Sequence, residues 1–227
     1  MSVKLVSAAE VIDSTGDAQP QAAVGAVRIN LGCNQRPQRG YINVDIVDYP
    51  GVDVVADLEK RWPWEDGSVD EVACADLPEH IRQWWETPDP TSVAAAEKVL
   101  SKSYTDMTEF EILREAVDML IDAIKFPKRT YGIIHFMNEA HRVLKGGGLL
   151  DCLIPSTDVA GRGAWQDPTH VSYWNESTLL YFCDMAGNFR GLYPALIKAK
   201  FRAREVKTYM PNPAGVTYLK FTLEKIE

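Results

Sequence analysis

Short apolar runs alternate with turn-forming residues over the first third of the chain. Four of these runs, rich in Val and Ile and each ended by Gly, Asp or Pro, predict β-strands at residues 26–32, 41–46, 52–58 and 69–76. Their near-continuous apolar character is typical of strands buried on both faces, as in a parallel sheet with helices on each side.

Helical spacing replaces this pattern in the middle of the chain. After the proline-rich stretch ETPDPTS, apolar residues recur at helical spacing from Phe110 to Ile124, and Thr108 with Glu111 forms a capping-box signature near the start. The stretch FPKR ends the run, because proline cannot continue a helix. We interpret residues at about 86–128 as a helical insertion into a sheet domain.

A second helix is predicted at residues 131–145, where an apolar stripe recurs at helical spacing and the glycines at 146–148 end the pattern. A buried strand follows at 148–155. After a loop at 156–174, Asn175 is placed to cap a short helix.

The C-terminal pattern closes the sheet. The helix predicted at 176–183 precedes strands at 201–210 and 216–224, and the short PNPAG turn between these strands requires antiparallel pairing. The layout predicts one α/β domain at 26–227, with a mostly parallel sheet, a C-terminal antiparallel hairpin and the helical insertion, after a flexible extension at 1–25. Ligands of such sheets bind beyond the carboxyl ends of the strands.

Composition and charge restrict the classes of partner. The chain has 227 residues, of which 46% are hydrophobic and 25% charged, and its formal net charge is -8. An acidic protein repels phosphate backbones, so extended nucleic-acid binding and binding to an anionic membrane are disfavoured. The four cysteines form no Cys-x-x-Cys pair, which leaves zinc ribbons and redox motifs without support. Without a signal segment or a long apolar span, the sequence indicates a cytoplasmic protein.

The sequence RINLGCNQRPQRGYINVDI, from Arg28 to Ile46, joins the first two predicted strands through a very short connection. A parallel crossover through a helix needs about a dozen residues, whereas the segment 33–40 is shorter and contains Pro37. Because a pyrophosphate is normally held at a helix N-terminus, the device that binds dinucleotides is missing. The pattern favours a ligand with an adenosine but no phosphate. S-adenosylmethionine fits, since its sulfonium cation suits a pocket rich in carboxylates.

Four residues follow the predicted strands and point to this ligand. Gly32 lacks a Cβ and lets a ligand approach the backbone, and Asp45 can accept two hydrogen bonds from ribose hydroxyls. Asp57 either meets the amine of an adenine or caps the following turn. Asp76 either lies near the methionine end of the cofactor or caps a helix at 77–85.

These stretches resemble the class I S-adenosylmethionine-dependent methyltransferases of bacterial or phage type, which implies a Rossmann-like fold. INLGC is similar to the first motif of the family and NVDI to its ribose-binding second motif. ADLEKRWPWEDGSVDEVACADLPEH and FMNEAHRVLKGGGLLDCLIP resemble the later conserved segments, so the resemblance covers residues 26–85 and 131–155. Two positions depart from the family pattern: Asn34 stands where a second glycine is usual, and Asn30 where an acid is usual.

The resemblance implies a set of S-adenosylmethionine contacts at the strand ends. They are Asn30, Gly32, Cys33, Asn34, Asp45, Ile46, Asp57, Leu58, Asp76 and Leu77. In the family, the residues that match Glu79 and His80 often hold a loop together, which implies a structural role here. Glu139 and Arg142 are predicted to anchor their helix to the adjacent turn.

The stretch WQDPTHVSYW, from Trp165 to Trp174, supplies the catalytic candidates. Asp167 and His170 are close across a Pro-containing turn, and a histidine oriented by a carboxylate is a suitable general base. The alternative is that both groups fasten the loop backbone. Trp165, Tyr173 and Trp174 either line an aromatic substrate wall or pack in the core. Asp167, His170 and another acid could also hold a metal, but no spacing matches a metal motif, so no metal is assigned.

The sequence therefore predicts S-adenosylmethionine-dependent methyl transfer to an O or N of a small or medium-sized acceptor, a small molecule or glycan-like compound. The protein's main task is then to place the nucleophile in line with the methyl group. Two alternatives are a non-catalytic S-adenosylmethionine-binding scaffold or regulator that acts through the insertion, and a nicotinamide-dependent oxidoreductase, which the short 33–40 segment disfavours. The insertion is interpreted either as a lid or as the contact surface of a homodimer.

Overall fold

The computed structural model describes residues 25–85, 108, 111–115, 117, 129–159, 162–189, 191–209, 213 and 215–227. Most of the predicted N-terminal extension and of the predicted insertion lies outside these residues, so their bounds stay predictions. The predicted capping box is confirmed. The amide of Thr108 donates to Glu111 Oε2 at 2.8 Å, and the amide of Glu111 donates to Thr108 Oγ1 at 3.3 Å.

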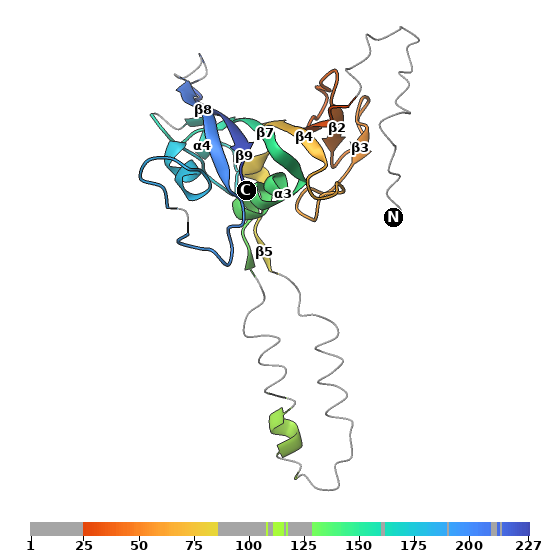
Figure 1. Cartoon of the computed structure of the whole chain (residues 1–227), viewed down its shortest axis with the longest axis vertical. Coiled ribbons are helices and arrows are strands. Elements are labelled where there is room, and N and C mark those ends of the chain that lie inside the picture. The colour runs from red at the N-terminus through yellow and green to blue at the C-terminus, as the bar shows by residue number, and fades with distance from the viewer. Residues whose placement is uncertain are drawn as a thin grey trace.

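Seven strands form one sheet in the order β3-β2-β1-β4-β7-β9-β8 (Figure 1). Their bounds are Arg28–Leu31 (β1), Ile42–Asp45 (β2), Val54–Val55 (β3), Val69–Ala75 (β4), Leu144–Pro155 (β7), Phe201–Tyr209 (β8) and Tyr218–Lys225 (β9). Neighbouring strands are parallel from β3 to β7, whereas β9 is antiparallel to both β7 and β8. The predicted fold class is confirmed: this is an α/β, Rossmann-like, mostly parallel sheet with a C-terminal antiparallel hairpin.

The helical elements that belong to the sheet domain are α3 (Gly132–Val143), α4 (Arg162–Gln166) and the 3-10 helices η1 (Pro78–His80) and η2 (Glu176–Tyr181). Within the predicted insertion, the described residues 111–115 are also helical. The predicted second helix is confirmed as α3, but it ends before the glycines at 146–148, which lie inside β7. Asn175 caps η2 as predicted, because its side chain accepts from the amide of Thr178 at 3.1 Å. The short α4 lies in the stretch predicted to be a loop. Among the described residues, we find no helix with the length and apolar character that a bilayer crossing needs.

The helix predicted at 77–85 is wrong beyond its first turn. Only Pro78–His80 is helical, and Trp84–Trp85 (β5) instead pairs antiparallel with Arg129–Thr130 (β6). The two ends of the predicted insertion therefore lie side by side in a small ribbon that projects from the sheet domain (Figure 1). Pairing with β6 overrides the local helical preference, because it supplies hydrogen-bond partners that the sequence of 77–85 does not reveal.

On its C-terminal side, at β7 and β9, the sheet has one buried apolar face and one face with polar side chains. On β9, the apolar face consists of three fully buried residues, Leu219, Phe221 and Leu223. They share the core with α3, which contributes Phe136 and Met137. On the opposite face, Asp151 of β7 forms an ion pair with Lys220 and accepts from Thr222 Oγ1 at 2.7 Å. The polar pairs on this second face belong to β7 and β9. The expectation that the first strands are buried on both faces holds for β1 and β2, where the consecutive residues 29–31 and 43–45 are all buried.

The connection from β1 to β2 contains no helix between residues 32 and 41, as predicted. A single side chain closes it instead. Asn43 Oδ1 accepts from the amide of Gln38 at 2.6 Å and from Asn30 Nδ2 at 3.0 Å, and Asn43 Nδ2 donates to the carbonyls of Gln38 and Tyr41, both at 3.2 Å. The side-chain amide of Asn43 thus supplies hydrogen-bond partners to backbone groups that would bond to one another within a crossover helix.

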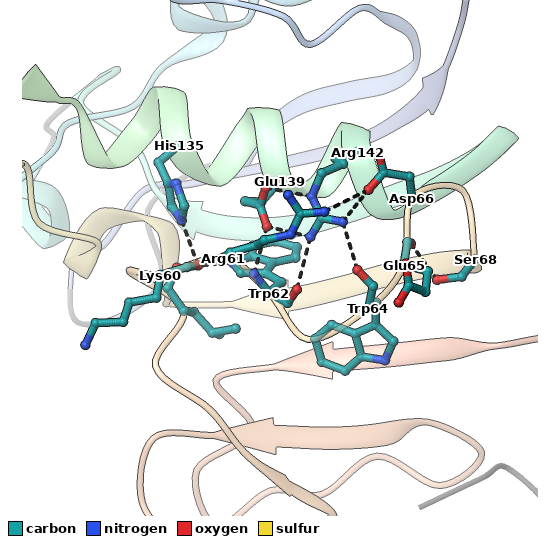
Figure 2. A network of polar contacts seen from close by, with 11 residues as sticks. Lys60, Arg61, Trp62, Trp64, Glu65, Asp66, Ser68, His135, Glu139 and Arg142 are labelled. Carbon is teal, nitrogen blue, oxygen red and sulfur yellow. Dashed lines mark hydrogen bonds and ion pairs between the residues drawn. The ribbon is translucent and has the colours of Figure 1, made fainter. Parts of the chain in front are cut away.

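Helix α3 is tied to the segment before β4 by the guanidinium of Arg142 (Figure 2). Arg142 donates to the two carboxylate oxygens of Glu139 at 2.8 and 2.7 Å. It also donates to the carbonyls of Trp62 and Trp64 at 3.0 and 2.8 Å and to Asp66 Oδ1 at 2.8 Å. Glu139 in turn accepts from the amide of Trp62 at 2.7 Å. The structure therefore confirms the anchoring role predicted for Glu139 and Arg142.

Candidate functional site

A cavity opens at the carboxyl ends of β1 and β4, the two strands at which the order of the sheet reverses. Its volume is about 530 Å³, which is within the usual range of small-molecule sites. It is lined by Asn30, Gly32, Cys33, Asn34, Gln35, Arg36, Ala75 and Asp76. Open α/β sheets bind ligands at such a switch point. Five of the residues predicted to contact a cofactor line this cavity: Asn30, Gly32, Cys33, Asn34 and Asp76.

Gly32 is required where β1 ends. Its φ of 65° lies in the left-handed region, which residues with a side chain adopt only at a cost. A Cβ at this position would also lie 3.0 Å from Leu77 Cδ1. Leu77 is therefore placed by direct packing against Gly32, and glycine lets the chain turn tightly beside the cavity.

Asp45 holds the rim of the cavity without lining it. Its carboxylate is buried, with Oδ2 accepting from the amide of Asn34 at 2.8 Å and Oδ1 accepting from the amide of Val47 at 3.0 Å. The first bond fixes Asn34 with a left-handed φ of 48°. Each carboxylate oxygen keeps a further lone pair, so a ribose contact stays compatible with this geometry.

Asp76 and Arg36 place opposite charges at the cavity. Withdrawal from water raises the pKa of Asp76, although the nearby charges of His80 and Arg36 and a hydrogen bond with Tyr218 oppose that effect. Sequence reasoning missed Arg36 as a cavity residue, because its place at the cavity depends on how residues 33–40 fold back. The sequence indicated only that a charged residue lies shortly after the first strand.

Besides Asp45 and Leu77, three further predicted contacts do not line the cavity. Ile46 is 64% exposed, and Leu58 is buried in the core, where only its backbone would be available to a ligand. Asp57 accepts from Lys60 Nζ at 2.8 Å and from the amide of Glu59 at 3.1 Å, and the bond from Lys60 above all lowers the pKa of Asp57. These contacts match the alternative in which Asp57 caps its own turn.

Known proteins resemble this chain in structure rather than in sequence. No family model and no curated protein matches it. Three structural neighbours are S-adenosylmethionine-dependent methyltransferases.

The first of these neighbours is the 1,6-didemethyltoxoflavin-N1-methyltransferase of Burkholderia thailandensis, solved with 1,6-didemethyltoxoflavin and S-adenosylhomocysteine. It is 12% identical, with a TM-score of 0.48 over 89% of this chain and 72% of the neighbour. A methyltransferase from Archaeoglobus fulgidus is 12% identical, with a TM-score of 0.47 over 88% of this chain and 87% of the neighbour. A variant of the 16S rRNA (adenine(1408)-N(1))-methyltransferase of Catenulisporales acidiphilia, solved with S-adenosylmethionine, is 13% identical, with a TM-score of 0.41 over 89% of this chain and 85% of the neighbour. Such low identities transfer no substrate to this chain.

The catalytic candidates His170 and Asp167 lie on the loop after β7 and do not line the cavity. The distance between His170 Nε2 and Asp167 Oδ2 is 3.8 Å, which is longer than a hydrogen bond. Asp167 Oδ1 accepts instead from the amide of Thr169 at 2.8 Å and from its hydroxyl at 2.6 Å, while His170 Nδ1 donates to the carbonyl of Ala164 at 3.0 Å. Both groups fasten the loop, as the alternative hypothesis expects, and the general-base role stays a prediction.

Glu79 presents a buried carboxylate beneath this loop. The main chain of Glu79 holds the loop, because its carbonyl accepts from the amide of Val171 at 2.8 Å. Its side chain is different. Glu79 is 1% exposed, and neither carboxylate oxygen has a hydrogen-bond partner among the described residues. Burial raises the pKa of Glu79 to about 8, and the charges of Asp76 and Asp167 act in the same direction.

The three aromatic candidates separate into two environments. Trp174 is fully buried and stacks on Phe221 with ring centroids 6.1 Å apart, so it belongs to the core. Trp165 and Tyr173 are 60% and 44% exposed and stack on each other with centroids 4.1 Å apart. This exposed pair is the part of the predicted aromatic wall that remains available to a substrate.

Proposed function

We propose that this protein transfers a methyl group from S-adenosylmethionine to an O or N of a small-molecule or glycan-like acceptor. The observation that carries the proposal is the cavity at the switch point of the sheet, whose rim, residues 32–36, is a turn without a helix. Dinucleotide sites place a pyrophosphate on a helix N-terminus at this position. The rim suits a nucleoside without phosphate.

The residues of the cavity match the charges of this cofactor. Its amino-acid end carries an ammonium and a carboxylate, and its sulfur is a cation. Asp76 supplies a carboxylate for the positive groups, and Arg36 supplies a guanidinium for the negative one. Gly32 keeps the space next to the backbone free of a side chain. Asp45 keeps the Asn34 turn in place and can add a ribose contact.

Bound S-adenosylmethionine supplies a methyl carbon that leaves its sulfur for the acceptor, and the sulfur keeps the electron pair of the broken bond. The chain itself has to bind the cofactor and the acceptor, orient them toward each other and exclude water. The exposed stack of Trp165 and Tyr173 offers a flat apolar surface for a planar or sugar ring. His170 is our candidate for removing a proton from an acceptor hydroxyl.

Calorimetric titration with S-adenosylhomocysteine tests the cofactor assignment. We expect saturable binding of one molecule per chain, and at least tenfold weaker binding in Asp45→Ala, which loses both the Asn34 contact and the ribose acceptor. The matched control is Asp48→Ala, which removes an exposed carboxylate of the same stretch and should bind as the parent does. Equal affinities of Asp45→Ala and the parent would remove Asp45 from the site.

A further inference from the structure

Beside the cavity, Glu79, His80 and His170 bring three potential metal ligands together. Each offers one ligand atom, and these atoms all lie within 4.8 Å of one another. The closest recorded approach of the carboxylate is 4.0 Å, between Glu79 Oε1 and His170 Nε2. The rings of His80 and His170 meet edge to face with centroids 4.7 Å apart. The cluster is therefore compact, yet its members form no hydrogen bond with one another that would explain it.

Hydrogen bonds at Nδ1 fix the tautomers of both histidines. His170 Nδ1 faces the carbonyl of Ala164 at 3.0 Å, and a carbonyl can only accept, so Nδ1 carries the proton. His80 Nδ1 lies 3.1 Å from Thr169 Oγ1, whose own proton is donated to Asp167 Oδ1 at 2.6 Å. Nδ1 of His80 must therefore donate as well. In the neutral form of either ring the lone pair is therefore on Nε2, and a hydrogen bond from the other nitrogen is how proteins orient histidines that bind metals.

The carboxylate of Glu79 is the third group, and among the described residues no other residue donates a hydrogen bond to it. It is 1% exposed, and both of its oxygens are without a hydrogen-bond partner among the described residues. A buried carboxylate with no donor is costly. Two imidazole lone pairs beside it add acceptors and no proton. A small cation satisfies all three groups at once, whereas a hydrogen bond between any two of them would leave the third unpaired.

We propose that Glu79, His80 and His170 form a binding site for one divalent first-row transition cation. Two imidazoles and one carboxylate are the ligand set of sites for Zn²⁺, Fe²⁺ and related ions that keep open positions for water or substrate. Ligand distances of about 2.1 Å allow donor atoms up to about 4.2 Å apart. The side chains therefore need only a small closure to bind an ion.

The position of the cluster near the cavity suits a role for the ion in binding the acceptor. Asp76 lines the cavity and stands three residues before Glu79 in the chain, and the charges of His80 and His170 lower its pKa, so the cluster lies near the cavity. This step rests on the proposed function: an ion here would hold an oxygen of the acceptor and favour its deprotonated form. With His170 Nε2 bound to the ion, the ion would take the place of His170 as the group that favours loss of this proton. Sequence reasoning assigned Glu79 and His80 to the loop. It could not see that residues 79–80 and 170, far apart in the chain, meet in space.

Titration with metal alone tests the site. The protein is first treated with a chelator and then titrated with Zn²⁺ by calorimetry and with Co²⁺ by visible absorption. We expect one ion per chain, a Co²⁺ spectrum with nitrogen and oxygen ligands, and at least tenfold weaker binding in Glu79→Gln and in His80→Ala. His135→Ala, which removes a histidine of α3 outside the cluster, is the control and should bind as the parent does. Circular dichroism checks that each variant is folded.

Saturable binding that survives unchanged in Glu79→Gln and His80→Ala, or no saturable binding at all, would overturn the proposal. Glu79→Gln keeps the shape of the buried side chain, so its folding should be preserved. Titration with S-adenosylhomocysteine on the metal-free protein separates the two proposals. If the cofactor product binds and metal does not, only the metal site fails. If metal binds and the cofactor product does not, the proposed function fails and the metal site stands.

Discussion

At the scale of single residues, Gly32 links the cavity to the packing of the sheet. Gly32→Ala forces a side chain into a left-handed backbone, which costs about 1–2 kcal/mol, and places its Cβ 3.0 Å from Leu77. We expect lower stability and weaker binding of S-adenosylhomocysteine. Urea unfolding and calorimetry measure the two effects.

The matched control for that substitution is Gly40→Ala. Gly40 also has a positive φ, of 82°, but an added Cβ there would meet nothing within 4 Å. The backbone cost is common to both variants, so any additional loss in Gly32→Ala measures the contact with Leu77. Equal losses of stability and unchanged ligand affinity would show that Gly32 is only a turn residue.

Sequence reasoning located the residues that stand directly at strand ends. Gly32 and Asp76 could be predicted because each follows an apolar run, and parallel strands end at one edge. Arg36 and Asn43 could not. Their roles depend on how residues 33–40 fold back over the sheet, which no local pattern records. Asp45 was predicted to bind a ribose, but its bonds to the amides of Asn34 and Val47 appear only in three dimensions.

At the scale of elements, the anchor between α3 and the segment before β4 should dominate the stability of the helix layer. Arg142 and Glu139 have side chains that are 14% and 12% exposed. Removing one partner of such a buried pair leaves a charge uncompensated, which costs about 3–5 kcal/mol. We expect Arg142→Met to lose that much in urea unfolding. The control, Arg202→Met, removes an arginine that is 53% exposed and should cost about 0–1 kcal/mol.

The same anchor also gives a stability difference that depends on pH. Burial by itself raises the pKa of Glu139, but the hydrogen bonds from Arg142 and from the amide of Trp62 outweigh it and hold the pKa below its ordinary value. The stabilisation is therefore present above the unfolded-state pKa, about 4.3, and is lost as the pH falls through the lower folded value. The difference in stability between the parent and Glu139→Gln should shrink below that pH. A difference that grows on acidification would contradict the anchor.

The elements were predictable in kind but not in their surroundings. In β9 the strict alternation Leu219-Lys220-Phe221-Thr222-Leu223-Glu224 indicates a strand with one polar face. In β7 the run LLDCLIP gives no such indication, because Leu149 and Leu153 lie on the polar face. The ribbon of β5 and β6 was missed because its two strands are separated in sequence by the predicted insertion.

At the scale of the whole molecule, the candidate functional residues lie together beyond the carboxyl ends of the central strands β1 and β4. The cavity, the acid of Asp76 and the cluster of Glu79, His80 and His170 all follow β1 or β4 or contact the segment after β4. On β7 and β9, one face of the sheet carries polar pairs. The connection between β1 and β2, which lies in the described part of the chain, contains no α-helix. The absence of that helix is what separates this cavity from a site for a dinucleotide.

The central claim is that this cavity accepts an adenosyl group without a diphosphate. Parallel calorimetric titrations of the unmodified protein with S-adenosylhomocysteine and with NAD test it most directly. We expect saturable, one-to-one binding of S-adenosylhomocysteine and no saturable heat with NAD. Tight binding of NAD, or no binding of S-adenosylhomocysteine, would contradict the account.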